Sequence, residues 1–104
     1  MGVPRALTDE EIAAALAELP GWTREGDEIT RTYEIRYHAA VAAIVTIADR
    51  SRRIQHHADL DLRIDSLRAA ITTHDAGHVL TLADFDLAQR IDAIVAAHQA
   101  LPLD

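Results

Sequence analysis

The sequence contains no cysteine, which excludes disulfide bonds and thiolate zinc sites. Aromatic residues make up only 4% of the 104 residues, and basic residues are outnumbered by acidic ones, 10 against 17. The resulting formal charge of −7 disfavours nucleic acid and anionic membranes as partners. Charges or histidines interrupt every apolar stretch before it reaches the ~20 residues that a membrane span requires.

What is present is the composition of one small globular domain, with 49% hydrophobic and 26% charged residues. We therefore predict a single domain over residues 1–104. The opening segment "MGVPRALTDEE" lacks the apolar core of a signal peptide, so we expect a cytoplasmic protein.

Helical spacing predicts three helices. The first follows a capping-box pattern made by Thr8 and Glu11 and stops at Pro20. The second runs from His38 to about Gln55, and the third follows Thr81, which can cap it. The apolar residues expected to face the core are Ile12, Leu16 and Leu19 in the first helix, Val41, Ile44, Val45, Ile47, Ala48 and Ile54 in the second, and Phe85, Ala88, Ile91, Ile94 and Val95 in the third.

Alternating apolar residues predict two hairpins, one turning at Gly26-Asp27 and one at Asp65-Ser66. The element order is helix, two strands, helix, two strands, helix, which predicts an α+β fold. In it, a four-stranded antiparallel sheet carries its helices on one face. The other face would be polar, and the open edge strands favour a symmetric homodimer or homotetramer. The residues expected on the polar face are Thr30, Thr32, Asp59, Asp61 and Arg68.

Histidines are the main chemical signal. His56 and His57 precede the first strand of the second hairpin, and His74 follows its second strand. These positions lie at the same end of an antiparallel hairpin, so we expect the three imidazoles to share one pocket. Asp84, near the start of the last helix, is the nearest candidate carboxylate. Such a cluster can hold a neutral base and a protonated acid together near neutral pH.

Structural alternatives exist for each of these residues. The pair His56-His57 could simply stabilise the end of the second helix, and Asp84 could be the capping partner of Thr81. His74 and His78 are four residues apart, as in helical metal pairs, but the intervening Gly77 argues against a helix. We therefore predict no metal, with binding by three histidines as the alternative. Trp22 is expected in the core.

The segments "HHADLDLRIDSLRAAITTHDAG" and "LADFDLAQRID", together with "LTDEEI" and "LPGW", resemble the pterin-4a-carbinolamine dehydratases over nearly the whole chain. The hallmark of that family is a glutamate three residues ahead of His-His-Pro, then an aromatic residue, a third histidine and an aspartate. The residues that match the hallmark are His56, His57, His74 and Asp84. The departures are Arg52 for the glutamate, Ala58 for the proline, Ile64 for the aromatic residue, and one extra residue within "HDAGHVLTLAD".

The resemblance implies dehydration of 4a-hydroxytetrahydropterin to quinonoid dihydropterin, without metal or cofactor. His56 is expected to act as the base, and His57 or His74 as the acid on the hydroxyl side. The residues expected to bind the pterin substrate are Thr72, Thr73 and Asp61.

Arg52 would place a positive charge beside the imidazoles and oppose their protonation. The loss of motif residues also favours an alternative, a catalytically weak or inactive protein that binds other proteins. Relatives of this kind include a dimerisation cofactor of a homeodomain transcription factor and a Rubisco assembly chaperone.

Overall fold

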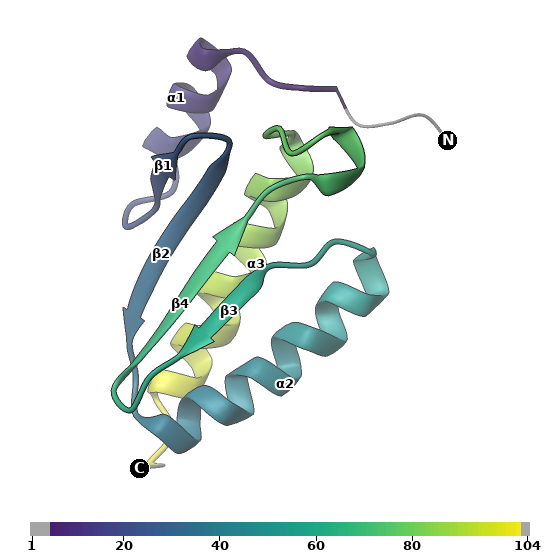
Figure 1. Ribbon diagram of the computed structural model, residues 1–104. Helices are drawn as coiled ribbons and strands as arrows, with labels where there is room; N and C mark the ends of the chain where they lie inside the picture. Colours follow the sequence, from purple (N-terminus) through teal and green to yellow (C-terminus); the bar gives the residue numbers. More distant parts are fainter. Residues whose placement is uncertain (1–4, 103–104) are drawn as a thin grey trace.

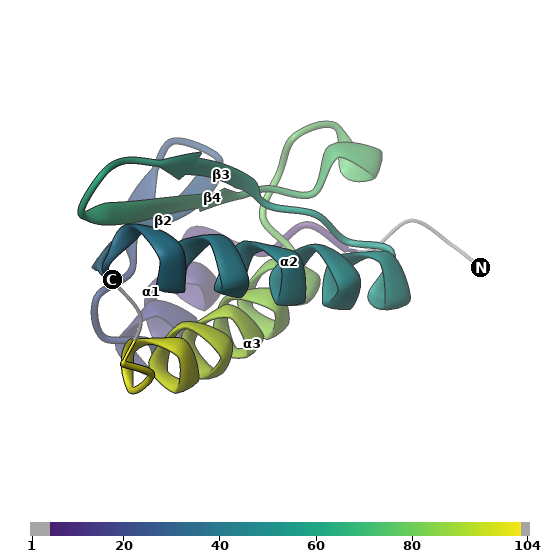
Figure 2. The same cartoon turned by 90° about the horizontal axis from the view of Figure 1, so that it is seen from below.

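The computed structural model describes residues 5–102, and its elements follow the predicted order (Figure 1). The helices and strands are α1 (Asp9–Ala17), β1 (Thr23–Glu25), β2 (Glu28–Glu34), α2 (Tyr37–Ile54), β3 (Asp59–Leu62), β4 (Ser66–Ile71), the single 3₁₀ turn η1 (His74–Ala76) and α3 (Leu82–Gln99). The four strands form one antiparallel sheet in the order β1-β2-β4-β3. Helices α2 and α3 run across one face of this sheet, and α1 lies on the same side (Figure 2). The predicted α+β fold is confirmed.

Local sequence signals explain where the outer helices begin. Thr8 caps α1 and forms the predicted capping box with Glu11, whose carboxylate accepts from the Thr8 N–H at 2.9 Å. The Arg5 guanidinium donates to the same carboxylate at 2.8 Å, and this hydrogen bond, together with the one from the Thr8 N–H, lowers the pKa of Glu11 to about 2. Thr81 caps α3 in the same way, with Asp84 at the third helical position. Both predicted capping residues therefore start their helices.

The core lies between the sheet and the helices, as the period-two and helical patterns predict. Along β2 and β4 the residues that face the helices have little or no exposed surface. The predicted stripe of α3 packs against them and is buried at every position. The central residues are Ile29, Tyr33, Leu67, Ala69 and Ile71 from the sheet and Phe85, Ala88, Ile91, Ile94 and Val95 from α3.

The predicted buried face of α2 is wrong in part. Val41 and Val45 are exposed, at 39% and 67%, and Ala48 is also exposed, whereas Ile47 is buried as expected. The helix packs on the sheet and α3 through a row of small residues, which lets the backbones approach closely. That row consists of Ala39, Ala40, Ala43 and Ser51 with Ile47. Because apolar residues occur around most of α2, their spacing alone did not select the buried side.

The face of the sheet away from the helices carries the predicted polar residues, but one of them is not exposed to solvent. Thr32, Asp59 and Asp61 are exposed, but Thr30 is buried. The Thr30 hydroxyl donates to the carboxylate of Glu25, and Arg68 contacts the same carboxylate at 3.4 Å. The longer side chains of this face thus cover the threonine.

Asp92 on α3 joins the helix to the sheet through one carboxylate oxygen. Its Oδ1 accepts from the Trp22 indole N–H at 3.0 Å, the Arg31 guanidinium at 2.9 Å and the Tyr33 hydroxyl at 2.5 Å. Trp22 and Tyr33 are buried, which confirms the core position predicted for the tryptophan. Burial, with the hydrogen bond to Asp92, raises the pKa of the Tyr33 hydroxyl.

Replacing Asp92 with alanine is expected to lower the free energy of unfolding by about 2–4 kcal/mol, because it leaves the polar groups of Trp22 and Tyr33 without their acceptor. Urea denaturation measures the change. Asp86→Ala is the matched control, since Asp86 lies on the same helix but forms only an exposed pair with Arg90. Equal losses in the two variants would contradict the role assigned to Asp92.

Candidate active site

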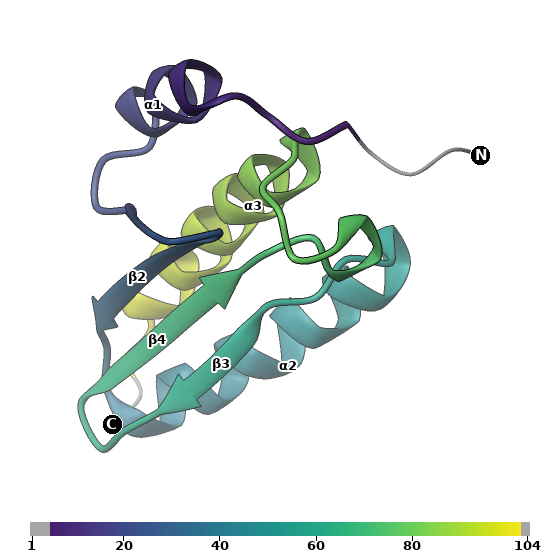
Figure 3. The ribbon, with the colours of Figure 1, turned by 45° about the horizontal axis from the view of Figure 1, so that its top comes forward.

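Histidines 56 and 57 lie in the short connection between α2 and β3. The helix ends at Ile54, and Gln55 adopts a left-handed conformation with φ of 54°. The His56 N–H then donates to the Ser51 carbonyl at 3.1 Å, which closes the last turn. This geometry turns the chain back toward the sheet at the end where β4 finishes and η1 begins (Figure 3).

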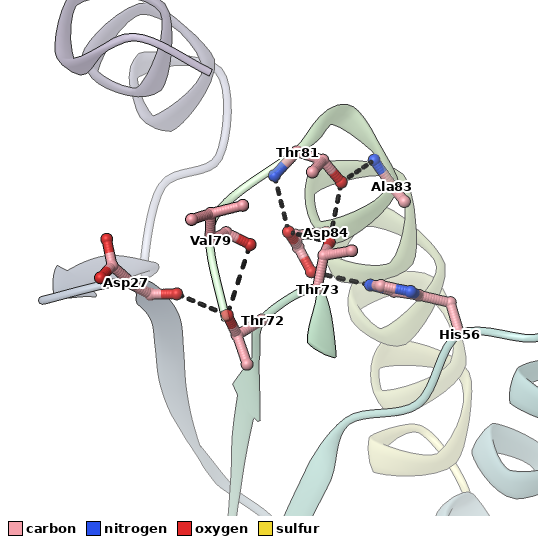
Figure 4. A network of polar contacts seen from close by, with 8 residues as sticks. All are labelled: Asp27, His56, Thr72, Thr73, Val79, Thr81, Ala83 and Asp84. Carbon is pink, nitrogen blue, oxygen red and sulfur yellow. Dashed lines mark hydrogen bonds and ion pairs between the residues drawn. The ribbon is translucent and has the colours of Figure 1, made fainter. Parts of the chain in front are cut away.

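Asp84 is fully buried at the start of α3, where the helix dipole favours a negative charge. Its Oδ2 accepts from the Thr81 N–H at 2.8 Å and from the Thr73 hydroxyl at 2.7 Å (Figure 4). The hydroxyls of Thr73 and Thr81 are themselves 2.8 Å apart. The carboxylate is therefore held by two segments, the start of α3 and Thr73, the second residue after the end of β4.

His56 completes this network. Its Nε2 lies 2.7 Å from Oδ1 of Asp84, and its side chain is 14% exposed (Figure 4). An ionised carboxylate only accepts hydrogen bonds, so with Asp84 ionised the proton of this contact belongs to Nε2 of His56. Asp84 thus serves both as the capping partner of Thr81 and as the anchor of an imidazole.

The second ring nitrogen of His56 remains open to solvent. Within residues 5–102, His56 Nδ1 has no hydrogen-bond partner, yet no buried side-chain nitrogen or oxygen lacks one. Nδ1 therefore keeps some solvent-accessible surface, although the His56 side chain is only 14% exposed. When the ring is neutral and Nε2 carries the proton, the free lone pair is on Nδ1. This arrangement presents a proton acceptor to solvent from a fixed ring.

The other two histidines are exposed. His74 directly follows Thr73 and so starts at the same end of the sheet as His56, and its ring contacts that of His78. His57 forms no hydrogen bond or ion pair in the described part of the chain. The structure therefore brings His56 and Asp84 into direct contact, while the shared pocket of three imidazoles remains a prediction.

The proposed substrate-binding side chains have internal partners. The Thr72 hydroxyl donates to the Asp27 carbonyl at 2.6 Å, and the Thr73 hydroxyl donates to Asp84. Both threonines are buried. Asp61 is exposed in the middle of β3 and pairs with Arg63 at 3.3 Å. Both hydroxyls are therefore engaged within the protein, and their contact with a substrate remains a prediction.

Two of the residues that depart from the motif, Arg52 and Ile64, are exposed. Arg52 is 69% exposed and contacts Asp49 at 2.7 Å, so its charge is balanced by a carboxylate and solvated. Hydrogen bonds from Arg53 and Arg52 lower the pKa of Asp49. Ile64 lies in the β3–β4 turn, at the opposite end of the hairpin, and is 77% exposed. The expectation that Arg52 acts on the imidazoles is therefore not supported by its placement.

A surface hollow lies at the far end of the molecule from His56. It is lined by the end of β2, the start of α2, the β3–β4 turn and the last residues after α3, including Tyr37, Ile64 and Leu101. None of the candidate catalytic residues lines it. The hollow is therefore separate from the histidine site.

The described part of the chain was also examined for a metal centre and for a helix that could span a membrane. Within residues 5–102, no three histidine, aspartate or glutamate side chains gather closely enough to hold a metal ion. None of the helices in the same range combines the length and hydrophobicity that a membrane span requires.

Fold and site together define a class of small α+β proteins with an imidazole–carboxylate pair at one end of an antiparallel sheet. Residues 5–94 match the family described as pterin 4 alpha carbinolamine dehydratase. The chain belongs to this family, as the resemblance predicted.

Relatives and a solved structure agree with this assignment. A Nocardia farcinica protein is 45% identical over 89 residues, which cover 85% of this chain and 93% of the relative. A Chloroflexus aurantiacus protein is 44% identical over 94 residues, covering 89% and 99%. Both are provisionally named pterin-4-alpha-carbinolamine dehydratase.

The crystal structure of a Brucella melitensis protein, described as a transcriptional coactivator/pterin dehydratase, superposes with a TM-score of 0.82. It is 23% identical, and the match covers 88% of this chain and 99% of that one. This likeness shows the shared fold.

Proposed function

We propose that this protein dehydrates 4a-hydroxytetrahydropterin to quinonoid dihydropterin by histidine acid–base catalysis. The observation that carries the proposal is the contact between His56 Nε2 and the buried Asp84 carboxylate, which fixes an imidazole with its other nitrogen at the surface. Membership of the dehydratase family supports the reaction and the pterin substrate. The reaction places the protein in tetrahydropterin recycling.

The proposed chemistry needs one acid and one base. A proton is delivered to the C4a hydroxyl, which leaves as water, and the proton on N5 is removed. The electrons of the N5–H bond form the N5–C4a double bond as the C4a–O bond breaks. No electron is transferred to another molecule, so the reaction needs no redox cofactor.

His56 is assigned to the base, because its Nε2–H is held by Asp84 and its Nδ1 is free to take the N5 proton. The acid is assigned to His57 or His74, which are both exposed. His57 is next to His56 in the sequence, and His74 lies at the same end of the sheet as His56. Asp84 is a positioning residue that acts through His56. Thr72, Thr73 and the carboxylate of Asp61 are proposed to contact the pterin ring.

The test is a stopped-flow assay with freshly generated 4a-hydroxytetrahydropterin, in which the protein should accelerate formation of quinonoid dihydropterin above the spontaneous rate. An unchanged rate would overturn the proposal and favour the alternative, a protein-binding module. The exposed apolar residues Tyr37, Val41 and Val45 on α2 are the observation that favours this second function.

Arg52→Ala is expected to change the dehydration rate by no more than ~2-fold, because an exposed charge paired with Asp49 is screened by water and salt. The rates of the variant and the wild type are compared in the same assay. Arg90→Ala, which removes the partner of Asp86 on the surface of α3, serves as the arginine control. A tenfold effect confined to Arg52→Ala would contradict the solvated position of this side chain.

We also propose a homodimer or homotetramer. Strands β1 and β3 lie at the two edges of the sheet, and α2 exposes Tyr37, Val41 and Val45. Pairing of edges or of these apolar side chains would remove them from water. Multi-angle light scattering at micromolar concentration should therefore give a mass of two or four chains. A monomer would refute this part of the proposal.

A further inference from the structure

The connection between β4 and α3 holds two histidines in a closed loop. The Thr73 N–H donates to the Val79 carbonyl at 3.0 Å, and the His78 N–H donates back to the Thr73 carbonyl at 3.1 Å. Between these bonds the chain makes the single turn η1 and then reverses. The loop is therefore fixed at its base by two main-chain hydrogen bonds.

Two successive left-handed residues direct this reversal. Gly77 has φ of 86° and His78 has φ of 62°, a region that residues with a Cβ rarely adopt. The turn carries His78 back toward His74, so that His74 Nδ1 and His78 Nε2 are 3.4 Å apart. The ring centroids are separated by 4.6 Å and the ring planes are nearly perpendicular, at 88°.

This separation is long for a hydrogen bond, whose usual length with an N–H donor is ~2.7–3.2 Å. It suits two ligands of one metal ion, because nitrogens ~2.0–2.1 Å from a tetrahedral ion are ~3.3–3.4 Å apart. Both side chains are exposed, so water can fill the remaining positions around an ion. Imidazole nitrogens are preferred ligands of zinc, nickel and copper.

We propose that His74 and His78 form a two-histidine site for a divalent transition-metal ion such as Zn²⁺. The ligands are Nδ1 of His74 and Nε2 of His78, as neutral imidazoles. Binding occupies a lone pair of His74 and thereby removes this histidine from acid–base chemistry. The site would make dehydration sensitive to free metal, a consequence that rests on the proposed function.

The variant that tests the site is His78→Asn, because asparagine tolerates the left-handed conformation and is a weak ligand for these ions. His98→Gln is the matched control, since His98 lies on α3 and its Nδ1 contacts the Ile94 carbonyl at 2.7 Å. Both variants are compared with the wild type by calorimetric titration with ZnCl₂ in a buffer that does not bind metal. Thermal unfolding checks that each variant is folded.

The wild type and His98→Gln should bind Zn²⁺ with equal affinity, and His78→Asn should bind at least ~10-fold more weakly. In ¹⁵N NMR spectra, the ion should shift His74 Nδ1 and His78 Nε2 of the wild type. Equal affinity of His78→Asn and the wild type, or shifts confined to other histidines, would overturn the metal site.

The dehydration assay separates the two proposals. Zn²⁺ should slow the wild type reversibly, with recovery on adding a chelator, and should have much less effect on His78→Asn. If Zn²⁺ binds as expected but neither protein accelerates dehydration, the metal site stands and the proposed function fails. If the wild type is active and remains so with the ion bound, the inhibitory consequence is refuted.

Discussion

Replacing Asp84 with alanine is expected to lower the free energy of unfolding by about 3–5 kcal/mol, a large share of the ~5–15 kcal/mol of a typical domain. The carboxylate is fully buried and is the acceptor for the Thr81 N–H, the Thr73 hydroxyl and His56. Its removal leaves these donors without a partner and takes away the third-position residue of the α3 capping box. Chemical denaturation measures the loss.

The variant Asp84→Asn tests the position of the proton on the His56 ring with little effect on the stability of the fold. The amide keeps the shape of the carboxylate and one accepting oxygen, so the loss of stability should be much smaller than for alanine. If the amide nitrogen faces His56, Nε2 must accept a hydrogen bond instead of donating, and the proton moves to Nδ1. Because Nδ1 is then no longer a base, we expect the dehydration rate to fall by ~10²-fold or more.

The control for both variants is Asp86→Asn, which changes an exposed carboxylate two residues further along α3. It should leave stability and rate close to those of the wild type. An Asp84→Asn protein as active as this control would show that the contact between Asp84 and His56 has no part in catalysis.

Replacing His56 with glutamine is expected to lower the dehydration rate by ~10²–10⁴-fold, the usual contribution of a general base. The glutamine amide can still donate to Asp84, so the fold should be retained. It cannot accept a proton near neutral pH, which isolates the base function. The rate constants of the variant and the wild type come from stopped-flow traces at saturating substrate.

His98→Gln makes the same substitution on α3, away from the end of the sheet where His56 lies, and should keep the wild-type rate. An active His56→Gln protein would assign the base to His57 or His74 and refute the role of His56. Loss of activity in both variants would point to damage of the fold rather than of the site.

Short-range sequence patterns were sufficient to predict the helices and strands and part of the site. The capping residues Thr8 and Thr81, the turn at Gly26-Asp27 and the stripe of α3 are short-range patterns, and each appears where the sequence placed it. Asp84 was identified as a candidate because it lies three residues into the last helix, next to the loop that carries His74. The contact with His56 follows from that arrangement.

Features that depend on packing were not predictable. The buried side of α2 is set by the size of Ala40 and Ala43 against the sheet and α3, while the larger Val41 and Val45 face outward. Hydropathy ranks the valines as better core residues, so the periodic pattern could not detect this choice.

Two features of the site, the partner of the Thr73 hydroxyl and the position of His78, also could not be predicted from the sequence. Thr73 was expected to meet the substrate, but its hydroxyl is used by Asp84, a contact between residues of different elements. His78 was set aside because Gly77 argues against a helix, and the loop indeed forms only one 3₁₀ turn. The left-handed conformation of His78, which no local signal indicated, brings it to His74 by another route.

We propose that Asp84 fixes the proton of His56 on Nε2 and leaves Nδ1 as a base. Long-range ¹H–¹⁵N NMR of the wild-type protein, at a pH high enough for neutral imidazole, measures this tautomer directly. We predict that His56 Nε2 carries the proton and that Nδ1 shows the shift of an unprotonated nitrogen, with the pattern reversed in Asp84→Asn. A proton on Nδ1 of neutral His56 in the wild type would refute the role of Asp84 in setting the tautomer and that of Nδ1 as the base.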